Sequence, residues 1–321
     1  MHKKVANAFA PGAISSFFEI FKTAHNGTPL TDLQYVGARG GGFGLQCGVH
    51  TKVSVDDASS NSIQVFINDR FAPEAKVTHN VARTILNNVS KRCAVVVEHQ
   101  IDVPIGMGFG TSAGGALTTG LALKEALNLP LTYNQIGTIA HLAEIQSQTG
   151  LGTVSSLSVG GGLILVTEPG APGVCKIDRI PLSPNYVVVS GFYDSKISKA
   201  VLSSPERGEV INRYGRQTLD AILEEPSVEN FLSCCWLFAK RAGFASERVC
   251  ELVRLAVGSG AVGATQNMIG EAVHAVVLEE NAFSVVEVFK QVLPEKQVLC
   301  CKVDFQGVRL VNNDDDKEAV I

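Results

Sequence analysis

The sequence predicts an α+β protein of two lobes with a cleft between them. Strand-like alternation of apolar and polar residues dominates the first half, whereas the pattern after about residue 195 is mostly helical. A glycine-rich loop at 104–116 lies a third of the way along, directly before a strong helical pattern. We therefore expect an N-terminal lobe over 1–194, a C-terminal lobe over 195–311 and a flexible acidic tail over 312–321.

Apolar periodicity assigns the individual elements. Strands are predicted over 4–10, 49–55, 63–67, 94–99, 162–167, 186–190 and 297–303. Helices are predicted over 75–89, from 111 to about 127, and over 132–148, 206–224, 228–242, 246–257, 267–278 and 283–291. A second glycine-rich turn is expected over 37–43.

The composition is that of a soluble globular chain, and it disfavours several classes of function. The 321 residues are 45% hydrophobic and 18% charged, with a formal net charge of −4. That balance gives no support for binding nucleic acid or an anionic membrane. The N-terminus lacks the apolar core of a signal peptide, and no run has the length of a transmembrane span. We therefore expect a cytoplasmic protein without nucleic-acid or membrane partners.

The eight cysteines are expected to be reduced thiols. They are Cys47, Cys93, Cys175, Cys234, Cys235, Cys250, Cys300 and Cys301. None forms a Cys-x-x-Cys motif, and most stand in apolar stretches, where cysteine packs as a small hydrophobic side chain. This usage favours a reducing cytosol and disfavours a zinc site.

The loop at 104–116 has the composition of a phosphate-binding loop. Gly106, Gly108 and Gly110 can adopt backbone angles that other residues avoid, so that successive N–H groups point around an anion. The helix that follows adds its free N–H groups and the positive end of its dipole. Thr111 and Ser112, at the helix start, can bind a phosphate oxygen or a metal ion. The loop therefore predicts an enzyme that uses a nucleotide.

Two other nucleotide sites fit less well. A Rossmann site needs Gly-x-Gly-x-x-Gly in the first strand–helix unit and an acidic residue about 20 residues later. Here the spacing is Gly-x-Gly-x-Gly, Glu125 is too close and Asp178 is too distant. A Walker A loop is excluded, because the chain contains no Gly-Lys-Ser or Gly-Lys-Thr.

A pair of polar residues marks the next helix. The helix opens with the capping box of Thr132 and Gln135 and ends near Gly150. His141 and Glu144 are three positions apart and share one face of it. A carboxylate alone on such a helix is more often a solvated surface residue, so its interpretation depends on what surrounds it.

Three glycine-marked segments together carry a resemblance to a known family. They are Ala10–Gly12, the loop at 104–116, and the stretch that joins Gly258–Gly263 to Gln266–Gly270. In this order they resemble the GHMP kinases, the superfamily of galactokinase, homoserine kinase, mevalonate kinase and phosphomevalonate kinase. Within it, the segments 10–20, 37–43, 140–144 and 149–152 resemble the archaeal pantoate kinases. The resemblance covers about residues 5–280.

The resemblance implies a fold, a reaction and a set of site residues. It implies a two-lobe α+β fold with ATP in the cleft, an N-terminal lobe like domain 2 of ribosomal protein S5, and a helix-rich α+β C-terminal lobe. The implied reaction transfers the γ-phosphate of ATP to the 4-hydroxyl of pantoate, with Mg²⁺. The ATP-binding residues would be Pro104, Gly106, Gly108, Gly110, Thr111, Ser112, Ala113 and Gly114.

The remaining implied residues hold the metal and the acceptor. Ser112 and Glu144 would bind Mg²⁺, since both offer hard oxygen ligands. With His141 they would form the catalytic set. Acceptor contacts would come from Ser15, His141 and Ser198, and Arg39 and Lys199 are cations for a carboxylate or a phosphate. The structural alternatives are a cap for Ser15, a turn surface for Arg39 and a solvated helix for Lys199.

One position departs from the family pattern. Where the family has Gly-Leu-Gly-Asp-Val, this chain has Thr153 in place of the aspartate. A threonine hydroxyl does not accept a proton at neutral pH, so Thr153 is not a general base. A cation expected near 165–167 is also missing. Phosphoryl transfer proceeds through a loose transition state, so a strong base is not essential.

These departures leave alternatives open. The acceptor could instead be mevalonate, a phosphorylated mevalonate or homoserine. A chain that has lost catalysis would be a non-catalytic nucleotide-binding homologue, and a nicotinamide-dependent dehydrogenase is a more distant alternative. Glycine-rich apolar segments in the second half would suit a homodimer interface.

Overall fold

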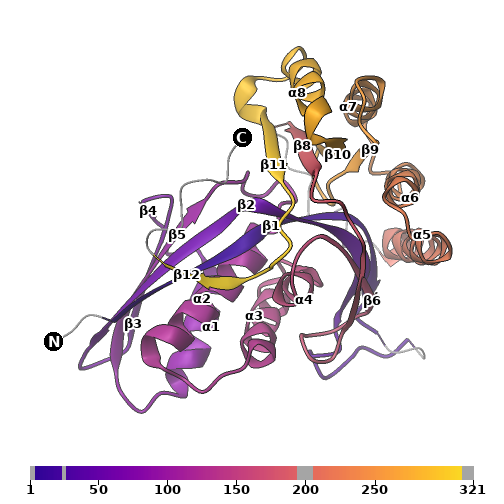
Figure 1. Ribbon diagram of the computed structural model, residues 1–321. Helices are drawn as coiled ribbons and strands as arrows, with labels where there is room; N and C mark the ends of the chain where they lie inside the picture. Colours follow the sequence, from indigo (N-terminus) through magenta and orange to yellow (C-terminus); the bar gives the residue numbers. More distant parts are fainter. Residues whose placement is uncertain (1–3, 24–26, 194–204, 313–321) are drawn as a thin grey trace.

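The computed structural model describes residues 4–23, 27–193 and 205–312 (Figure 1). Its strands form two sheets, and its helices lie in separate groups beside them, which confirms the predicted two-lobe α+β class. No helix among the residues described is long and apolar enough to cross a membrane. The predicted acidic tail lies almost entirely outside the described residues.

The first sheet contains eight strands, in the order β12-β1-β2-β5-β3-β4, with β6 pairing to β2 and to β7. Its strands are β1 (Lys4–Phe21), β2 (Gly37–Asp57), β3 (Ser62–Ile67), β4 (Arg70–Phe71), β5 (Cys93–Ile101), β6 (Leu163–Glu168), β7 (Lys176–Ile180) and β12 (Arg309–Val311). Among the pairs, β3–β5 is parallel and the others are antiparallel.

Four helices cover one face of this sheet: α1 (Lys76–Asn87), α2 (Thr111–Leu127), α3 (Tyr133–Ser147) and α4 (Thr153–Ser158) (Figure 1). The helix α2 is apolar on nearly all sides, and 12 of its 17 residues are buried. Its central position follows from that composition, because a helix without a polar face must be enclosed by other elements. The first core lies between these helices and β1, β2, β3 and β5.

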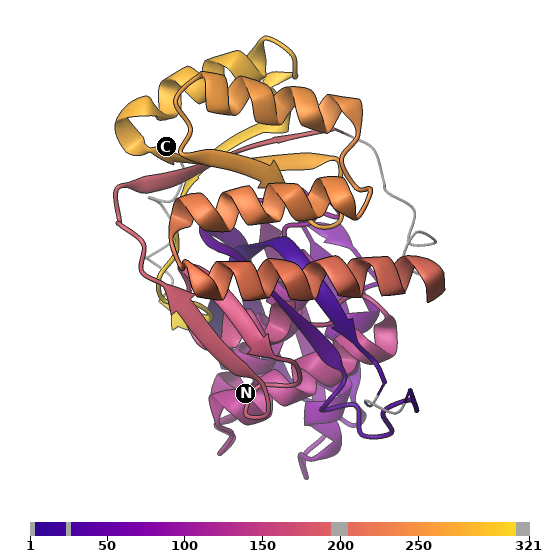
Figure 2. The same cartoon turned by 90° about the vertical axis from the view of Figure 1, so that its right-hand side faces the viewer.

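The second sheet has the order β11-β8-β10-β9 and forms the other lobe (Figure 2). Its strands are β8 (Tyr186–Phe192), β9 (Gly263–Gln266), β10 (Ala272–Leu278) and β11 (Val298–Lys302). The helices of this half are α5 (Pro205–Glu224), α6 (Val228–Arg241), α7 (Glu247–Gly258) and α8 (Ala282–Lys290), with 3₁₀ turns η2 (Glu279–Asn281) and η3 (Glu295–Gln297).

The expected lobe boundary at residue 194 stays a prediction. Two strands pair with the sheet on the opposite side of that boundary. The strand β8 precedes residue 194 but pairs with β10 and β11 of the second sheet. The strand β12 follows it but pairs with β1 of the first sheet. The chain therefore enters the second lobe early and returns to the first lobe at its end.

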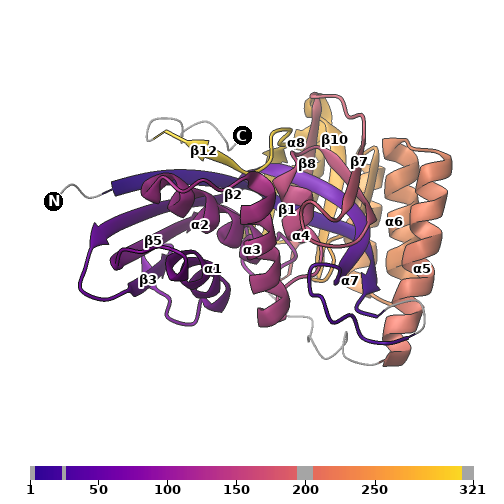
Figure 3. The ribbon, with the colours of Figure 1, turned by 90° about the horizontal axis from the view of Figure 1, so that it is seen from below.

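The two longest strands connect the lobes. Strands β1 and β2 pair from Lys4↔Val55 to Phe21↔Gly37, with register shifts at Pro11/Gly12 and Ser15/Phe17. In Figure 3 they run from the layer of α1–α3 toward α5 and α6. At that far end Phe17 packs edge-on against Phe231 of α6, at 6.1 Å between ring centroids. A second core between the lobes is built on this contact.

Two predicted elements were wrong. The stretch 267–278 was expected to be a helix, but β10 occupies its second part and pairs with β8 and β9. The stretch 37–43 was expected to be a turn, but it is the start of β2. Its glycines permit close contact between strands, since a Cβ on Gly42 would lie 1.7 Å from the Ile14 carbonyl oxygen.

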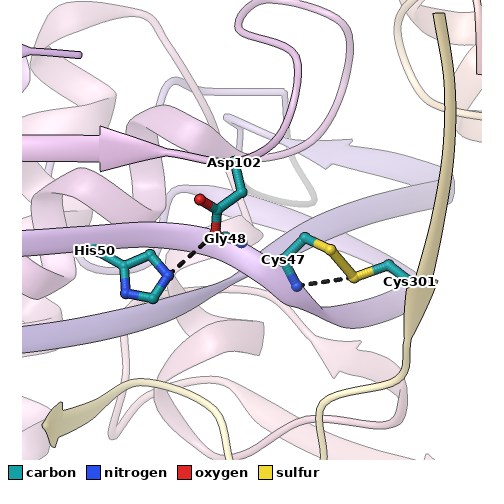
Figure 4. The surroundings of a disulfide bond; sticks show 5 residues. All are labelled: Cys47, Gly48, His50, Asp102 and Cys301. Carbon is teal, nitrogen blue, oxygen red and sulfur yellow. Dashed lines mark hydrogen bonds and ion pairs between the residues drawn. A yellow bond between two sulfur atoms is a disulfide. The ribbon is translucent and has the colours of Figure 1, made fainter. Parts of the chain in front are cut away.

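The expectation that all cysteines are reduced is also wrong. Cys47 of β2 and Cys301 of β11 form a disulfide across the two sheets, with their Cα atoms 6.3 Å apart (Figure 4). The other six cysteines are free thiols. This pair was not predictable, because 254 positions separate the two residues and only the fold brings them together.

A buried histidine ties α2 to its sheet. The ring of His99 on β5 contacts the Thr51 hydroxyl at 2.7 Å and the Thr78 hydroxyl at 3.0 Å. Thr51 in turn contacts the Thr118 hydroxyl of α2 at 2.5 Å. Burial lowers the pKa of His99 to about 4, so the ring is neutral at pH 7.

This neutral ring predicts a loss of stability in mild acid. The unfolded chain binds a proton near pH 6.5 and the folded chain only near pH 4, so stability is present above 6.5 and is lost as the pH falls toward 4. We expect His99 to cost about 2 kcal/mol of unfolding free energy between pH 7 and pH 5. Urea unfolding at both pH values measures this loss. The unfolding free energy of His99→Gln should fall by about 2 kcal/mol less than that of the parent between the two pH values. Equal losses would contradict it.

Candidate functional site

The loop before α2 has the conformation that its glycines predict. Gly106, Gly108 and Gly110 have φ angles of 84°, 81° and 64°, in the left-handed region that favours glycine. Gly110 caps α2, whose first internal hydrogen bond runs from the Gly114 N–H to the Gly110 carbonyl. The N–H groups of residues 111–113 precede that bond, at the positive end of the helix dipole. This arrangement can bind an anion.

The loop is bonded to β1, and β1 is bonded to the second lobe. The Ala13 N–H of β1 donates to the Phe109 carbonyl at 2.9 Å. The Met268 N–H donates to the Ser15 carbonyl at 2.7 Å, and a Cβ on Gly108 would lie 3.2 Å from the Met268 oxygen. The three glycine-marked segments identified in the sequence therefore lie together at one site.

Glu144 joins this site from α3. Its carboxylate oxygen Oε1 accepts hydrogen bonds from the Ser112 hydroxyl at 2.5 Å and from the Thr149 hydroxyl at 2.6 Å. Glu144 is 3% exposed, so its carboxylate is a buried group held in position by hydrogen bonds and is not a solvated surface charge. The structure brings Ser112 and Glu144 into contact, and their role as ligands of Mg²⁺ stays a prediction.

The oxygen atoms of this pair suit a hard divalent cation. Mg²⁺ takes few protein oxygens and completes its shell with water and phosphate oxygens. A hydroxyl and a carboxylate in contact beside a phosphate cradle fit that requirement. Within the described ranges, no group of three or more His, Cys, Asp and Glu residues could form a protein-only metal cage.

Sequence reasoning missed Thr149 and Gly150. The Thr149 N–H also donates to the Glu144 carbonyl at 3.1 Å, so this turn closes directly over the end of α3. A Cβ on Gly150 would lie 2.2 Å from Glu144 Oε2, so a larger residue would displace the carboxylate. The signal in the sequence was the Thr-Gly pair five and six residues after Glu144, which served only as a helix end and as part of the family resemblance.

His141 is bonded to the backbone of a segment outside its own helix. Its Nε2 lies 2.9 Å from the Val36 carbonyl oxygen, and the residue is 1% exposed. Burial lowers the pKa of His141, and the bonds to the carbonyls of Val36 and Leu33 partly oppose that shift. The ring therefore anchors a backbone segment, and its contact to the acceptor stays a prediction.

Arg39 is paired with a carboxylate of its own chain. Its Nε donates to Glu19 Oε2 at 2.8 Å, and its Nη2 contacts the same oxygen. The other oxygen of Glu19 accepts from Arg216 Nη2 of α5 at 3.0 Å. Because Glu19 is buried, the two guanidiniums compensate its charge and leave the cluster with a net charge of +1.

Of the remaining predicted acceptor residues, one lies beside the loop and two lie outside the described part of the chain. Ser15 lies on β1 beside the loop, and its carbonyl takes part in the bond to Met268. Ser198 and Lys199 lie outside the described residues. Thr153 begins α4, and its methyl carbon Cγ2 would lie 2.9 Å from a Cβ on Gly110. Thr153 therefore packs against the loop at the position where the family carries an aspartate.

A buried polar chain next to the loop was also missed. The Ser16 hydroxyl contacts His274 Nε2 at 2.9 Å, and His274 Nδ1 contacts Asn267 Oδ1 at 2.7 Å. All three residues are fully buried. Burial lowers the pKa of His274 to about 3, so the ring links β1 to the second lobe as a neutral group.

Comparison with known proteins decides the family. Residues 76–162 match the model of the GHMP kinases N-terminal domain, a stretch that contains the loop, Ser112 and Glu144. The pantoate kinase of Methanocaldococcus jannaschii is 28% identical over 289 residues, which cover 88% of this chain and 96% of that protein. The segment 76–162 is therefore identified as a GHMP kinase N-terminal domain.

Other proteins similar to this chain agree. The pantoate kinase of Thermococcus kodakarensis is 28% identical over 278 residues, which cover 86% of this chain and 88% of that protein. A solved structure described as a phosphotransferase related to the CoA biosynthesis pathway superposes with a TM-score of 0.82 at 26% identity, covering 96% and 98% of the two chains. A homoserine kinase from Cytophaga hutchinsonii, at 13% identity and a TM-score of 0.70, shares the fold.

Two glycines of this GHMP kinase loop should differ in their tolerance of alanine. A Cβ on Gly106 meets no atom within 4 Å, so Gly106→Ala should cost only the left-handed backbone strain, about 1–2 kcal/mol. A Cβ on Gly110 would lie 2.8 Å from the Ala13 Cβ, so Gly110→Ala should lose about 1–3 kcal/mol more. Urea unfolding measures both, and equal losses would show that the loop has room at Gly110.

The Thr149 hydroxyl should control the response of the enzyme to Mg²⁺. Thr149→Val removes one donor to the Glu144 carboxylate and leaves the size of the side chain nearly unchanged. We expect the Mg²⁺ concentration for half-maximal turnover to rise about tenfold, as for outer-shell partners of metal ligands. Binding of Mg·ADP followed by calorimetry should weaken in parallel.

Thr149→Ser is the matched control, because it keeps the hydroxyl. It should behave like the parent protein in both measurements. If Thr149→Val and Thr149→Ser weakened Mg²⁺ dependence equally, the lost packing of the methyl group would be the cause and the hydrogen bond would have no role.

Proposed function

We propose that this protein transfers the γ-phosphate of ATP to the 4-hydroxyl of pantoate, with Mg²⁺. The observation that carries the reaction type is the contact between Ser112 and Glu144 beside a loop whose glycines have left-handed angles. Pantoate as the acceptor is supported by relatives named pantoate kinase that align along most of the chain.

The loop would bind the triphosphate. The N–H groups around Gly106, Gly108 and Gly110 and those of the first turn of α2 would surround the β- and γ-phosphates. Because these groups are fixed before the nucleotide arrives, little reorganisation is needed when charge moves toward the leaving group. Phosphoryl transfer depends mainly on such positioning and charge neutralisation.

Ser112 and Glu144 would hold the cation that accompanies the nucleotide. Mg²⁺, when bound, neutralises charge on the β- and γ-phosphates. The Glu144 carboxylate would orient the Ser112 hydroxyl by accepting its hydrogen bond, which leaves the oxygen lone pairs of Ser112 for the cation. Thr149 keeps that carboxylate from rotating. Both residues therefore act through placement, which suits a loose transition state.

The acceptor would lie between β1 and the turn that begins α4. Ser15 lies on that strand beside the loop, and the Thr153 methyl group packs near Gly110. The net positive charge of the cluster of Arg39, Glu19 and Arg216 would attract the carboxylate of the acceptor. Since Thr153 is not a base, the hydroxyl proton would leave late, to a phosphate oxygen or water.

A panel of acceptors tests this proposal. Purified protein is supplied with Mg·ATP and, in separate reactions, with pantoate, mevalonate, phosphomevalonate or homoserine, and ADP release is followed. We expect turnover with pantoate to exceed turnover with each of the others by at least about tenfold, because an acceptor site built around hydrogen bonds rejects compounds that lack them. Turnover with another acceptor and none with pantoate would reject the assignment.

Glu144→Gln is the control for contaminating kinases. The amide keeps the shape of the side chain but cannot neutralise a divalent cation, so turnover should fall at least about a hundredfold. An unchanged melting temperature shows that the fold is intact. Residual activity equal to that of the parent would mean that the observed ADP release does not come from this site.

A further inference from the structure

The disulfide between Cys47 and Cys301 joins the two lobes at a specific place. Cys47 lies on β2 of the first sheet, and Cys301 lies on β11 of the second. Two residues further along, Leu45 pairs with Val303, and the Asp304 N–H donates to the Gly44 carbonyl at 2.9 Å. The bridge therefore stands at the start of the crossing by which the chain returns from the second sheet to the first (Figure 1).

The bridge shares its core with the phosphate loop. Both cysteines are fully buried, in the same apolar cluster as Val103, Met107 and Phe109. Met107 and Phe109 alternate with the three glycines of the cradle, so their packing fixes the loop from behind. A change in the packing between the lobes at the bridge therefore changes the packing of the residues that hold the loop in place.

Two short backbone connections lead from Cys47 to the loop. Gly48, the next residue, donates its N–H to the Asp102 carboxylate at 3.1 Å and accepts the Asp102 N–H at 3.0 Å (Figure 4). Asp102 stands two residues before the loop begins at Pro104. On the other side, a Cβ on Gly12 would lie 2.6 Å from the Cys47 carbonyl oxygen, and Gly12 precedes Ala13, which bonds to Phe109.

We propose that Cys47 and Cys301 are a reversible redox-modification site that sets the rigidity of the phosphate loop. In the oxidised form the bridge holds β11 against β2 and keeps the loop ordered. In the reduced form the lobes are joined at this place only by non-covalent packing, and the loop opens more often. The inference rests on the position of the bridge and not on the identity of the acceptor.

The chemistry is an exchange with a small disulfide. One thiolate attacks a sulfur of the small disulfide and releases one thiol, which leaves a mixed disulfide on the protein. The second thiolate displaces the other half, which leaves as a thiol. Two protein thiols are thereby oxidised and one external disulfide is reduced to two thiols. Because both sulfurs are fully buried, exchange requires a transient separation of the lobes.

Hydrogen exchange on the two redox forms tests the proposal. The protein is treated with oxidised glutathione or with dithiothreitol, and the state is checked by alkylation of the denatured chain, which should attach six labels or eight. We expect amides of 103–112 to exchange at least about fivefold faster in the reduced form. Amides of α1, remote from the bridge, serve as the internal reference and should exchange equally in both forms.

Two variants distinguish the effect of the bridge from the effect of the adjacent free cysteine, Cys300. Cys301→Ala should give the fast exchange of the reduced form and no response to dithiothreitol. Cys300→Ala, which keeps the bridge, should respond as the parent does. Binding of Mg·ADP should be weakened about fivefold by reduction.

Three results would overturn the proposal. Eight labels after treatment with the oxidant would show that the pair does not form a disulfide. Equal exchange of 103–112 in the two redox forms would show that the bridge does not act on the loop, and faster exchange spread equally over α1 would show a general loss of stability. The exchange measurement needs no substrate, so a failure to bind ADP would count against the proposed function alone.

Discussion

The site depends on two backbone hydrogen bonds of β1, which we call the backbone clasp: one to the glycine-rich loop and one to the second lobe. Phe109 of the loop accepts from Ala13 of β1, and Ser15 of the same strand accepts from Met268 of the second lobe. One strand therefore holds both the phosphate loop and the turn that closes over it. These are bonds between backbone groups, so they survive most changes of side chain but not the addition of a Cβ at Gly108 or Gly110. The cradle keeps its shape only while the two lobes stay packed along β1.

Within the loop segment 104–116, the positive charge comes from backbone groups and not from cationic side chains. The segment 104–116 contains no lysine or arginine, so the attraction for a triphosphate comes from N–H groups and the dipole of α2. Glu144 adds a buried negative charge next to them. A nucleotide and this carboxylate repel each other unless a cation lies between them. We therefore expect this carboxylate to favour the nucleotide bound with Mg²⁺ over the nucleotide alone.

Local features were predictable from the sequence, and long-range ones were not. The glycine spacing and the helical pattern after it predicted the loop and the start of α2, and the resemblance to GHMP kinases paired Ser112 with Glu144. The stretch 267–278 has a spacing that also fits a helix, and only pairing with β8 makes its end a strand. His141 shares a helix face with Glu144, yet spacing along a helix does not reveal that the ring meets the carbonyl of Val36. The Cys47–Cys301 pair depends wholly on how the two sheets meet.

Thr153 shows how these constraints bear on the chemistry. At the position where the family carries an aspartate, this chain places a methyl group against Gly110 of the cradle. The side chain therefore contributes packing to the loop and no basic group to the acceptor. An enzyme without that base gains its rate from alignment of the acceptor oxygen with the γ-phosphate and from charge neutralisation. Alignment depends on the clasp and on the packing between the lobes, so contacts remote from the reacting atoms carry more of the catalytic effect than they would beside a strong base.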